Sequence, residues 1–172
     1  ELAALDLADG NGVPSLSQVL DLLATLGLGA NVEIKAEGSE AATTGALAAV
    51  LCQAARERHG LSILISSFST AALAAARGAV ATLPRGLLYE RPPRDWRETA
   101  ALLDCVSLHV HHGSADAALA AVVHDAGLRL LAYTVNEPSL ATALFAAGVD
   151  GVFSDAPDRI LAALDASSSA SR

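Results

Sequence analysis

The hydrophobic positions of the chain alternate between two spacings. Short runs of apolar, often β-branched residues recur along the sequence, separated by longer stretches whose apolar residues lie three or four positions apart. The first spacing is typical of buried strands, and the second of helices that bury one face. We expect helices at 14–27, 43–58, 70–79, 95–104, 115–127, 138–148 and 157–166, and strands at 31–35, 62–68, 85–90, 105–112, 129–135 and 149–155.

Each expected strand is followed by a helix, which predicts a parallel sheet covered by helices. An open doubly wound sheet and a (β/α)8 barrel both fit this alternation. No glycine-rich phosphate loop follows any strand, and the polar residues are spread over the ends of all six strands rather than at one switch point. This spread favours an α/β fold of the (β/α)8 TIM-barrel type, with about six β/α units, over residues 1–164. Small polar residues predict a disordered tail over 165–172.

Composition narrows the function classes. Hydrophobic residues make up 52% of the 172 residues, as in a globular protein, and the formal net charge of −8 argues against nucleic acid as a main partner. No uncharged apolar stretch reaches the roughly 18 residues of a membrane-spanning helix, so no membrane insertion is expected. Cys52 and Cys105 have no ligand spacing and are interpreted as buried free thiols in a reducing compartment.

The strand at 31–35 carries the most informative charges. Val32 and Ile34 face one side of this strand, and Glu33 and Lys35 face the other. A structural ion pair is one interpretation, although burial of such a pair costs about as much as the attraction returns. A carboxylate that binds a hard cation next to an ammonium that binds phosphate is the other.

Histidines and an aromatic residue at later strand ends are further candidates. His109 shares a strand face with His111, but a zinc site lacks a third ligand at a suitable spacing, and an ordinary hydrogen-bonded histidine remains an alternative. Phe68 lies between serines that resemble helix caps rather than nucleophiles, so it is expected to form an apolar pocket wall. Trp96 is expected to pack outside the barrel.

Seven motifs in this order give the chain a family resemblance: VPSLSQVLDLL, NVEIK, ISSFS, RGLLYE, CVSLHVHH, AYTVN and GVDGVFSDAPD. From about Leu2 to Leu164 the sequence resembles the glycerophosphodiester phosphodiesterase family, and especially its cytosolic bacterial branch. The resemblance implies a (β/α)8 barrel that hydrolyses small-molecule glycerophosphodiesters to sn-glycerol 3-phosphate and an alcohol. It also implies a divalent cation, Mg²⁺ or Ca²⁺, and a cytoplasmic location.

The resemblance assigns roles residue by residue. Glu33 corresponds to a metal ligand, and Lys35 to a residue beside the phosphate. Tyr133, where the family usually has Trp, and Asn136 correspond to residues that line the substrate pocket. Phe68 and His109 correspond to further pocket-lining positions.

The chain also departs from the family pattern. The His-Arg-Gly, Glu-x-Asp and His-Asp motifs, which supply the family's catalytic histidines and two more metal ligands, are absent from this sequence. The chain therefore resembles the last three-quarters of a barrel, and no catalytic residue is assigned. The alternative function is a non-catalytic incomplete barrel that binds a phosphate ligand or a partner chain. Unpaired strand edges would then favour self-association.

Overall fold

The computed structural model describes residues 12–170, with side chains up to residue 165. The chain divides between Pro84 and Arg85 into two compact units. Both units follow the same rule: each strand runs parallel to its paired neighbour and is followed in the chain by a helix.

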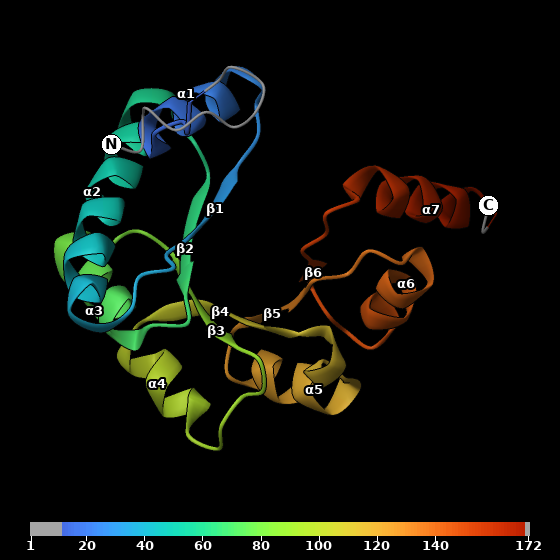
Figure 1. Ribbon diagram of the computed structural model, residues 1–172. Helices are drawn as coiled ribbons and strands as arrows, with labels where there is room; N and C mark the ends of the chain where they lie inside the picture. The colour runs from blue at the N-terminus through green and yellow to red at the C-terminus, as the bar shows by residue number, and fades with distance from the viewer. Residues whose placement is uncertain (1–11, 171–172) are drawn as a thin grey trace. The chain divides into compact units, whose positions relative to one another are not determined.

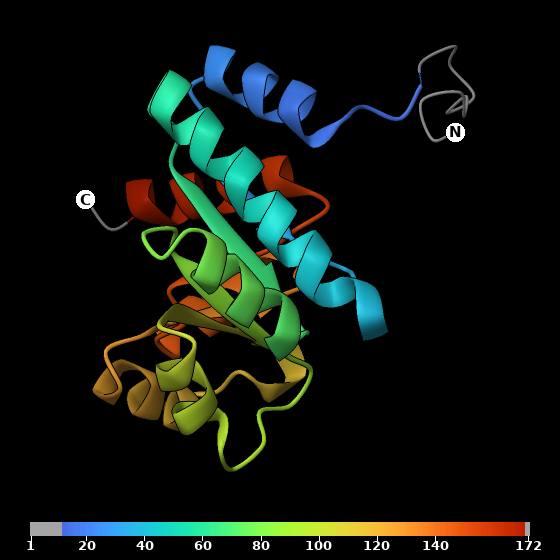
Figure 2. The ribbon, with the colours of Figure 1, turned by 90° about the vertical axis from the view of Figure 1, so that its left-hand side faces the viewer.

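The first unit contains two strands and three helices. Its elements are α1 (Leu16–Thr25), β1 (Ala30–Glu33), the 3₁₀ turn η2 (Gly38–Glu40), α2 (Ala41–His59), β2 (Ile63–Ser67) and α3 (Thr70–Ala79). Strands β1 and β2 pair so that Val32 lies opposite Ile65 and Glu33 opposite Ser66. Figures 1 and 2 show α2 and α3 covering the same face of these two strands.

Local sequence signals set the limits of these helices. Ser15 begins α1 with a capping box, in which its hydroxyl accepts from the Gln18 backbone N–H and the Gln18 side chain accepts from the Ser15 N–H. Gly60 ends α2 with a left-handed φ of 70°, a conformation that glycine adopts without steric cost. The helix starts and stops were therefore readable from the sequence.

The core of the first unit lies between β2 and the helices. Ile63 and Ile65 are buried there against a helix pair rich in alanine, including Ala49 and Ala72. Gly45 allows the close approach of α2 to α3, because a Cβ at this position would clash with the Ala72 carbonyl group. Cys52 belongs to this core as a free thiol, and burial raises its pKa to about 11.

The second unit contains four strands in chain order, β3-β4-β5-β6, all parallel (Figure 1). Its elements are β3 (Arg85–Tyr89), α4 (Trp96–Leu102), β4 (Cys105–His111), η3 (His112–Ser114), α5 (Ala117–Asp125), β5 (Arg129–Tyr133), α6 (Pro138–Ala146), β6 (Gly151–Val152) and α7 (Pro157–Ala170). Strands that neighbour each other in chain order, without a reversal, are typical of a barrel rather than a doubly wound sheet.

The second unit differs from the sequence prediction at its last two elements. Strand β6 has two residues rather than the seven expected at 149–155; backbone bonds to the β5 segment continue at Asp150 and Phe153, whereas Ser154 and Asp155 bond to the Asn136 side chain. Helix α7 runs to Ala170, through most of the segment expected to be a disordered tail. A helix that has begun at Pro157 extends at little cost per residue, and serine is only mildly unfavourable in it.

The second unit contains one hydrogen-bonded cluster around Asp150 and one cation–π contact at Trp96. The Asp150 carboxylate accepts hydrogen bonds from His124 Nε2 at 2.8 Å, Arg129 Nη1 at 2.7 Å and the Leu130 N–H at 2.8 Å. Trp96 is 7% exposed, and the Arg97 guanidinium lies 5.5 Å from the centre of its ring.

Burial raises the pKa of the free Cys105 thiol to about 11, so the expectation of two buried free thiols is confirmed.

Candidate functional site

In the first unit, three predicted site residues line one pocket. Glu33 ends β1, Lys35 follows it, and Phe68 follows β2. Together with Glu37, Ser67, Ser69 and the backbone between them, they surround a cavity of about 550 Å³. The carboxyl ends of two neighbouring parallel strands therefore bring the predicted metal ligand, phosphate ligand and apolar wall to one place.

Glu33 and Lys35 are both exposed in this pocket. Among the described residues, neither side chain takes part in an ion pair or a hydrogen bond. The interpretation as a structural ion pair is therefore not supported. A carboxylate and an ammonium that leave each other unpaired at the same strand end are both available to a ligand.

The serines around Phe68 shape the loop that carries it. Ser67 donates from Oγ to the Ile34 carbonyl at 2.7 Å and accepts the Ser69 N–H at 3.0 Å. Ser69 in turn caps α3 by accepting the Ala72 N–H at 3.2 Å. These bonds confirm the structural interpretation of Ser67 and Ser69, and they leave the Phe68 side chain 51% exposed at the pocket.

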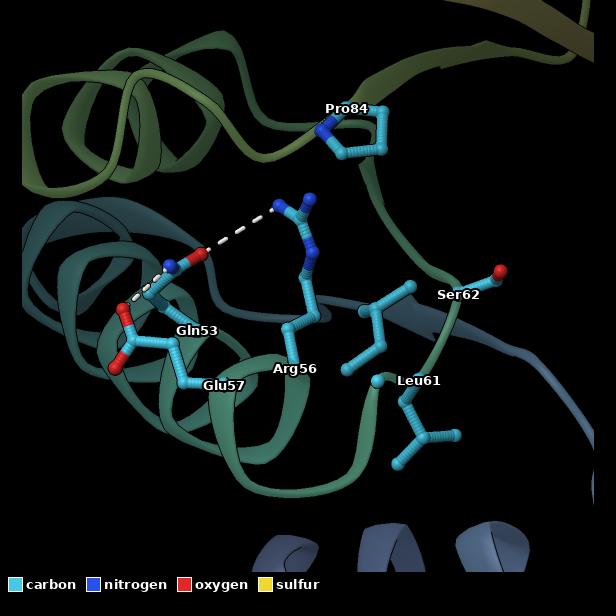
Figure 3. Close-up of a pocket in the computed structure, with 8 residues that line it drawn as sticks. Gln53, Arg56, Glu57, Leu61, Ser62 and Pro84 are labelled. Atoms are coloured by element: carbon cyan, nitrogen blue, oxygen red, sulfur yellow. Dashed lines mark hydrogen bonds between the residues drawn. The ribbon is translucent and has the colours of Figure 1, made fainter.

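A second pocket of the first unit lies at the opposite end of β2 and holds none of the predicted site residues. It has a volume of about 480 Å³ and is lined by Gln53, Arg56, Glu57, Gly60, Leu61, Ser62, Ile63 and Pro84 (Figure 3). Gln53 donates to Glu57 at 2.7 Å, and Arg56 donates to the Thr82 carbonyl at 3.2 Å. Because these polar groups bond to one another at the amino end of the strand, we interpret the pocket as structural.

In the second unit, His109 is completely buried. Its Nε2 lies 2.8 Å from Ser107 Oγ, and its ring packs against Phe153 with the ring centres 5.2 Å apart. Gly86 makes room for the ring, since a Cβ there would lie 2.5 Å from His109 Nε2. Burial lowers the pKa of His109 to about 4, which keeps the imidazole neutral.

The position of His109 bears on its predicted role. The ring has no exposed surface, and its Nδ1 has no hydrogen-bond partner among the described residues. A direct contact with substrate would require the ring to become exposed, so the predicted pocket-lining role stays a prediction. Its visible role is to fill the sheet face between Gly86 and Phe153.

Tyr133 and Asn136 each fix the geometry of a strand end. The Tyr133 hydroxyl donates to the Tyr89 carbonyl at 3.0 Å and so connects the ends of β5 and β3. The Asn136 Oδ1 accepts the Asp155 N–H at 2.9 Å, while its Nδ2 donates to the Asp155 carboxylate at 3.1 Å. Asp155 thus holds the Asn136 side chain in place.

The structure adds a pocket that sequence reasoning did not assemble. Glu90, Arg91, His111, Gly113 and Ser114 surround a cavity of about 670 Å³ at the ends of β3 and β4. The sequence placed His111 on the same strand face as His109, but no role was predicted for His111 or for Glu90. The signal that was missed is that neighbouring parallel strands bring their ends together.

A divalent cation would find few protein ligands among the described residues. Within the part of the chain that the structure describes, no group of three His, Cys, Asp or Glu side chains could hold a metal ion. Mg²⁺, however, is commonly held by one or two carboxylates together with substrate phosphate and water. The unpaired Glu33 carboxylate beside Lys35 fits a cation of this kind as a single protein ligand.

Comparison with known structures gives the same fold. A phosphodiesterase from Oleispira antarctica, solved in complex with sn-glycerol-3-phosphate, matches with a TM-score of 0.82 and 31% identity over 91% of this chain. A glycerophosphodiester phosphodiesterase from Parabacteroides distasonis matches with a TM-score of 0.78 and 21% identity over 97% of this chain, and it supports the fold alone. The chain spans 63% of the length of the first structure and 70% of the second. The predicted class, six β/α units of a (β/α)8 barrel, is confirmed.

Sequence comparison identifies the family. No protein of curated function matches the chain. Among the described residues, no helix is long and apolar enough to cross a membrane. The sequence model of the glycerophosphoryl diester phosphodiesterase family matches residues 2–159, which is most of the chain. The chain therefore belongs to the glycerophosphoryl diester phosphodiesterase family.

Proposed function

We propose that this chain takes part in the metal-dependent hydrolysis of glycerophosphodiesters to sn-glycerol 3-phosphate and an alcohol. The observation that carries the proposal is the pocket in which Glu33 and Lys35 are exposed and unpaired beside Phe68. The family supports the reaction class, and the bound sn-glycerol-3-phosphate of the Oleispira antarctica structure supports the ligand class.

Lys35 would bind the phosphate. An exposed ammonium at a strand end acts as a point charge toward phosphate oxygens, and it stabilises the negative charge that grows there during hydrolysis. Phe68 would cover the apolar edge of the glycerol. Tyr133 and Asn136 are proposed as substrate contacts of the second unit, with their orientations set by the bonds to Tyr89 and Asp155.

Glu33 would hold the divalent cation, Mg²⁺ or Ca²⁺. When bound, such a cation acts as a Lewis acid on the phosphodiester oxygens. Carboxylate oxygen is a suitable ligand for either ion. Because the Glu33 carboxylate forms no ion pair with the Lys35 ammonium among the described residues, the proposed cation site and the proposed phosphate site can lie next to each other.

A non-catalytic role is the second candidate. It is favoured by the lining of the cavity beside Glu33, which contains no histidine among the described residues. In this case the chain would bind a glycerophosphate ligand without turnover. Self-association stays a prediction. We propose a cytoplasmic location, supported by the two buried free thiols.

Replacement of Glu33 by Gln tests the proposal. Release of sn-glycerol 3-phosphate from a glycerophosphodiester is measured with Mg²⁺, with Ca²⁺ and with EDTA. We expect Glu33→Gln to lower the metal-dependent rate by roughly 100-fold, because one charged ligand is lost. Glu40→Gln, an exposed carboxylate outside this cavity, is the matched control and should keep the wild-type rate.

Two outcomes would change the assignment. A wild-type rate in Glu33→Gln would contradict the role of Glu33 as the metal ligand. Binding of sn-glycerol 3-phosphate by the wild-type chain, without hydrolysis under any of these conditions, would establish the non-catalytic role instead.

A further inference from the structure

The pocket at the ends of β3 and β4 has no role in the proposed function. It is lined by Glu90, Arg91, His111, Gly113 and Ser114, and we call it the β3–β4 pocket. From these residues we infer that it is the subsite for the alcohol headgroup of the diester. We further infer that it selects a headgroup carrying an ammonium and a carboxylate together, as serine does. The inference rests on the proposed function, because it concerns the specificity of the same reaction.

The β3–β4 pocket adjoins the residues proposed to hold the substrate. The His111 ring meets the Tyr133 ring edge-on, with 6.2 Å between the ring centres. Tyr133 in turn donates its hydroxyl hydrogen bond to the Tyr89 carbonyl, next to Glu90 in the chain. His111 therefore connects the β3–β4 pocket to Tyr133, one of the residues proposed to hold the substrate.

The walls of the pocket are held by hydrogen bonds. Ser114 donates from Oγ to the Glu90 carbonyl at 2.9 Å and so joins the loops that follow β3 and β4. The Gly113 N–H donates to His111 Nδ1 at 3.1 Å and fixes the ring. A pocket whose shape is set before binding loses less entropy when a ligand enters it.

The charges in the pocket are balanced and available. Glu90 and Arg91 are both exposed, and neither forms an ion pair or a side-chain hydrogen bond with any residue in the described part of the chain. One fixed anion and one fixed cation match a ligand that carries one charge of each sign. A singly charged headgroup would leave one of the two without a partner.

The uncharged groups of the pocket suit the same ligand. Because His111 Nδ1 accepts a backbone N–H, Nε2 is the ring nitrogen left to donate to a carboxylate. Ser114 Oγ uses its proton on the Glu90 carbonyl, so it keeps lone pairs that can accept from an ammonium. Donors and acceptors are thus both present for a zwitterionic headgroup.

Binding affinities of four ligands test the inference. The full chain is titrated with sn-glycero-3-phosphoserine, -phosphoethanolamine, -phosphoglycerol and sn-glycerol 3-phosphate, in EDTA so that metal-dependent hydrolysis is stopped. We expect the serine diester to bind about tenfold more tightly than the ethanolamine diester, which lacks one charged contact, and more tightly still than the glycerol diester, which lacks both. Arg91→Gln should remove the preference over the ethanolamine diester, Glu90→Gln should weaken the serine and ethanolamine diesters alike, and both variants should keep the affinity for sn-glycerol 3-phosphate within twofold of wild type.

The control and the opposing outcomes come from the same titrations and from the hydrolysis assay described for Glu33→Gln. Glu98→Gln, an exposed carboxylate on α4 that lines none of the pockets, should keep the preference. Equal affinity for all three diesters would overturn the inference, as would equal losses for the diesters and sn-glycerol 3-phosphate in the variants. Hydrolysis that depends on Glu33 without headgroup preference would overturn this inference and leave the proposed function intact. A serine preference without hydrolysis in Mg²⁺ would contradict the proposed hydrolysis and leave the headgroup preference intact.

Discussion

The two units treat the polar residues at their strand ends differently. In the first unit, Glu33 and Lys35 are exposed and unpaired around an open cavity. In the second unit, the predicted residues are already bonded: His109 to Ser107, Tyr133 to Tyr89, and Asn136 to Asp155. The predicted site residues of the first unit are therefore available to a ligand, whereas those of the second unit are held by protein partners, although Glu90 and Arg91 of the second unit are exposed like Glu33 and Lys35.

The difference shows how to interpret a polar strand end in a barrel. A charged group with no protein partner in an open cavity remains hydrated until a ligand replaces the water, so its loss should affect activity more than stability. A buried group with a protein partner contributes to stability, and its loss should affect folding first. Measuring activity and stability for each variant should therefore separate the effects of substitutions in the two units.

The largest difference between the effect on activity and the effect on stability is expected for Lys35. Lys35→Met should lower kcat/KM for a glycerophosphodiester by roughly 100-fold, because it removes the positive charge beside the phosphate. The melting temperature should change by no more than about 1 °C, since an exposed, unpaired side chain contributes little to stability. Lys35→Arg, which keeps the charge, is the matched control. A large drop in melting temperature in Lys35→Met would mean that Lys35 belongs to the structural group.

A glycine beside His109 tests the second unit from the stability side. Gly86→Ala would place a Cβ 2.5 Å from His109 Nε2 and 2.9 Å from Ser107 Oγ. We expect the free energy of unfolding to fall by about 2 kcal/mol, as in other overpacked cores. Denaturant titration measures this change.

Gly78→Ala provides the matched glycine control. Its added Cβ would meet no atom within 4 Å, so the free energy of unfolding should rise by up to about 1 kcal/mol through helix propensity. If the two substitutions had equal effects, the packing of His109 against Gly86 would not be limiting.

The smallest effect on the free energy of unfolding is expected when the pH is lowered. Burial lowers the pKa of His109 to about 4 in the folded protein, against an ordinary value of 6.5. The neutral ring therefore contributes stability that is fully present above pH 6.5 and is lost as the pH falls toward 4. Between pH 7 and pH 5.5 we expect a loss of about 1 kcal/mol from this residue.

A variant isolates the contribution of His109 from that of other groups. His109→Gln carries no titratable ring, so its unfolding free energy should fall less over the same pH range than that of the wild type. Asp150, whose pKa is lowered by its bonds to Arg129, His124 and Leu130 against the opposing effect of burial, is retained in both proteins and cancels in the comparison. Parallel pH profiles for the two proteins would contradict the assignment.

Much of the fold could be predicted from the sequence because it depends on local signals. Hydrophobic spacing located every described strand, and Ser15 and Gly60 set helix limits through their own backbone bonds. Strand alternation also placed Glu33 and Lys35 on one face. The burial of His109 could not be predicted, because it depends on Gly86 and Phe153 from other strands. The β3–β4 pocket likewise requires the bond from Ser114 to Glu90, which joins loops 24 residues apart.

The position of Trp96 has a practical consequence for spectroscopy. It is the only tryptophan of the chain, and it lies buried on α4 in the second unit. Intrinsic tryptophan fluorescence therefore reports on one unit alone, whereas circular dichroism records the helices of both. Coincident fluorescence and dichroism transitions would mean that the two units unfold as one cooperative body, and separate transitions would assign each midpoint to its unit.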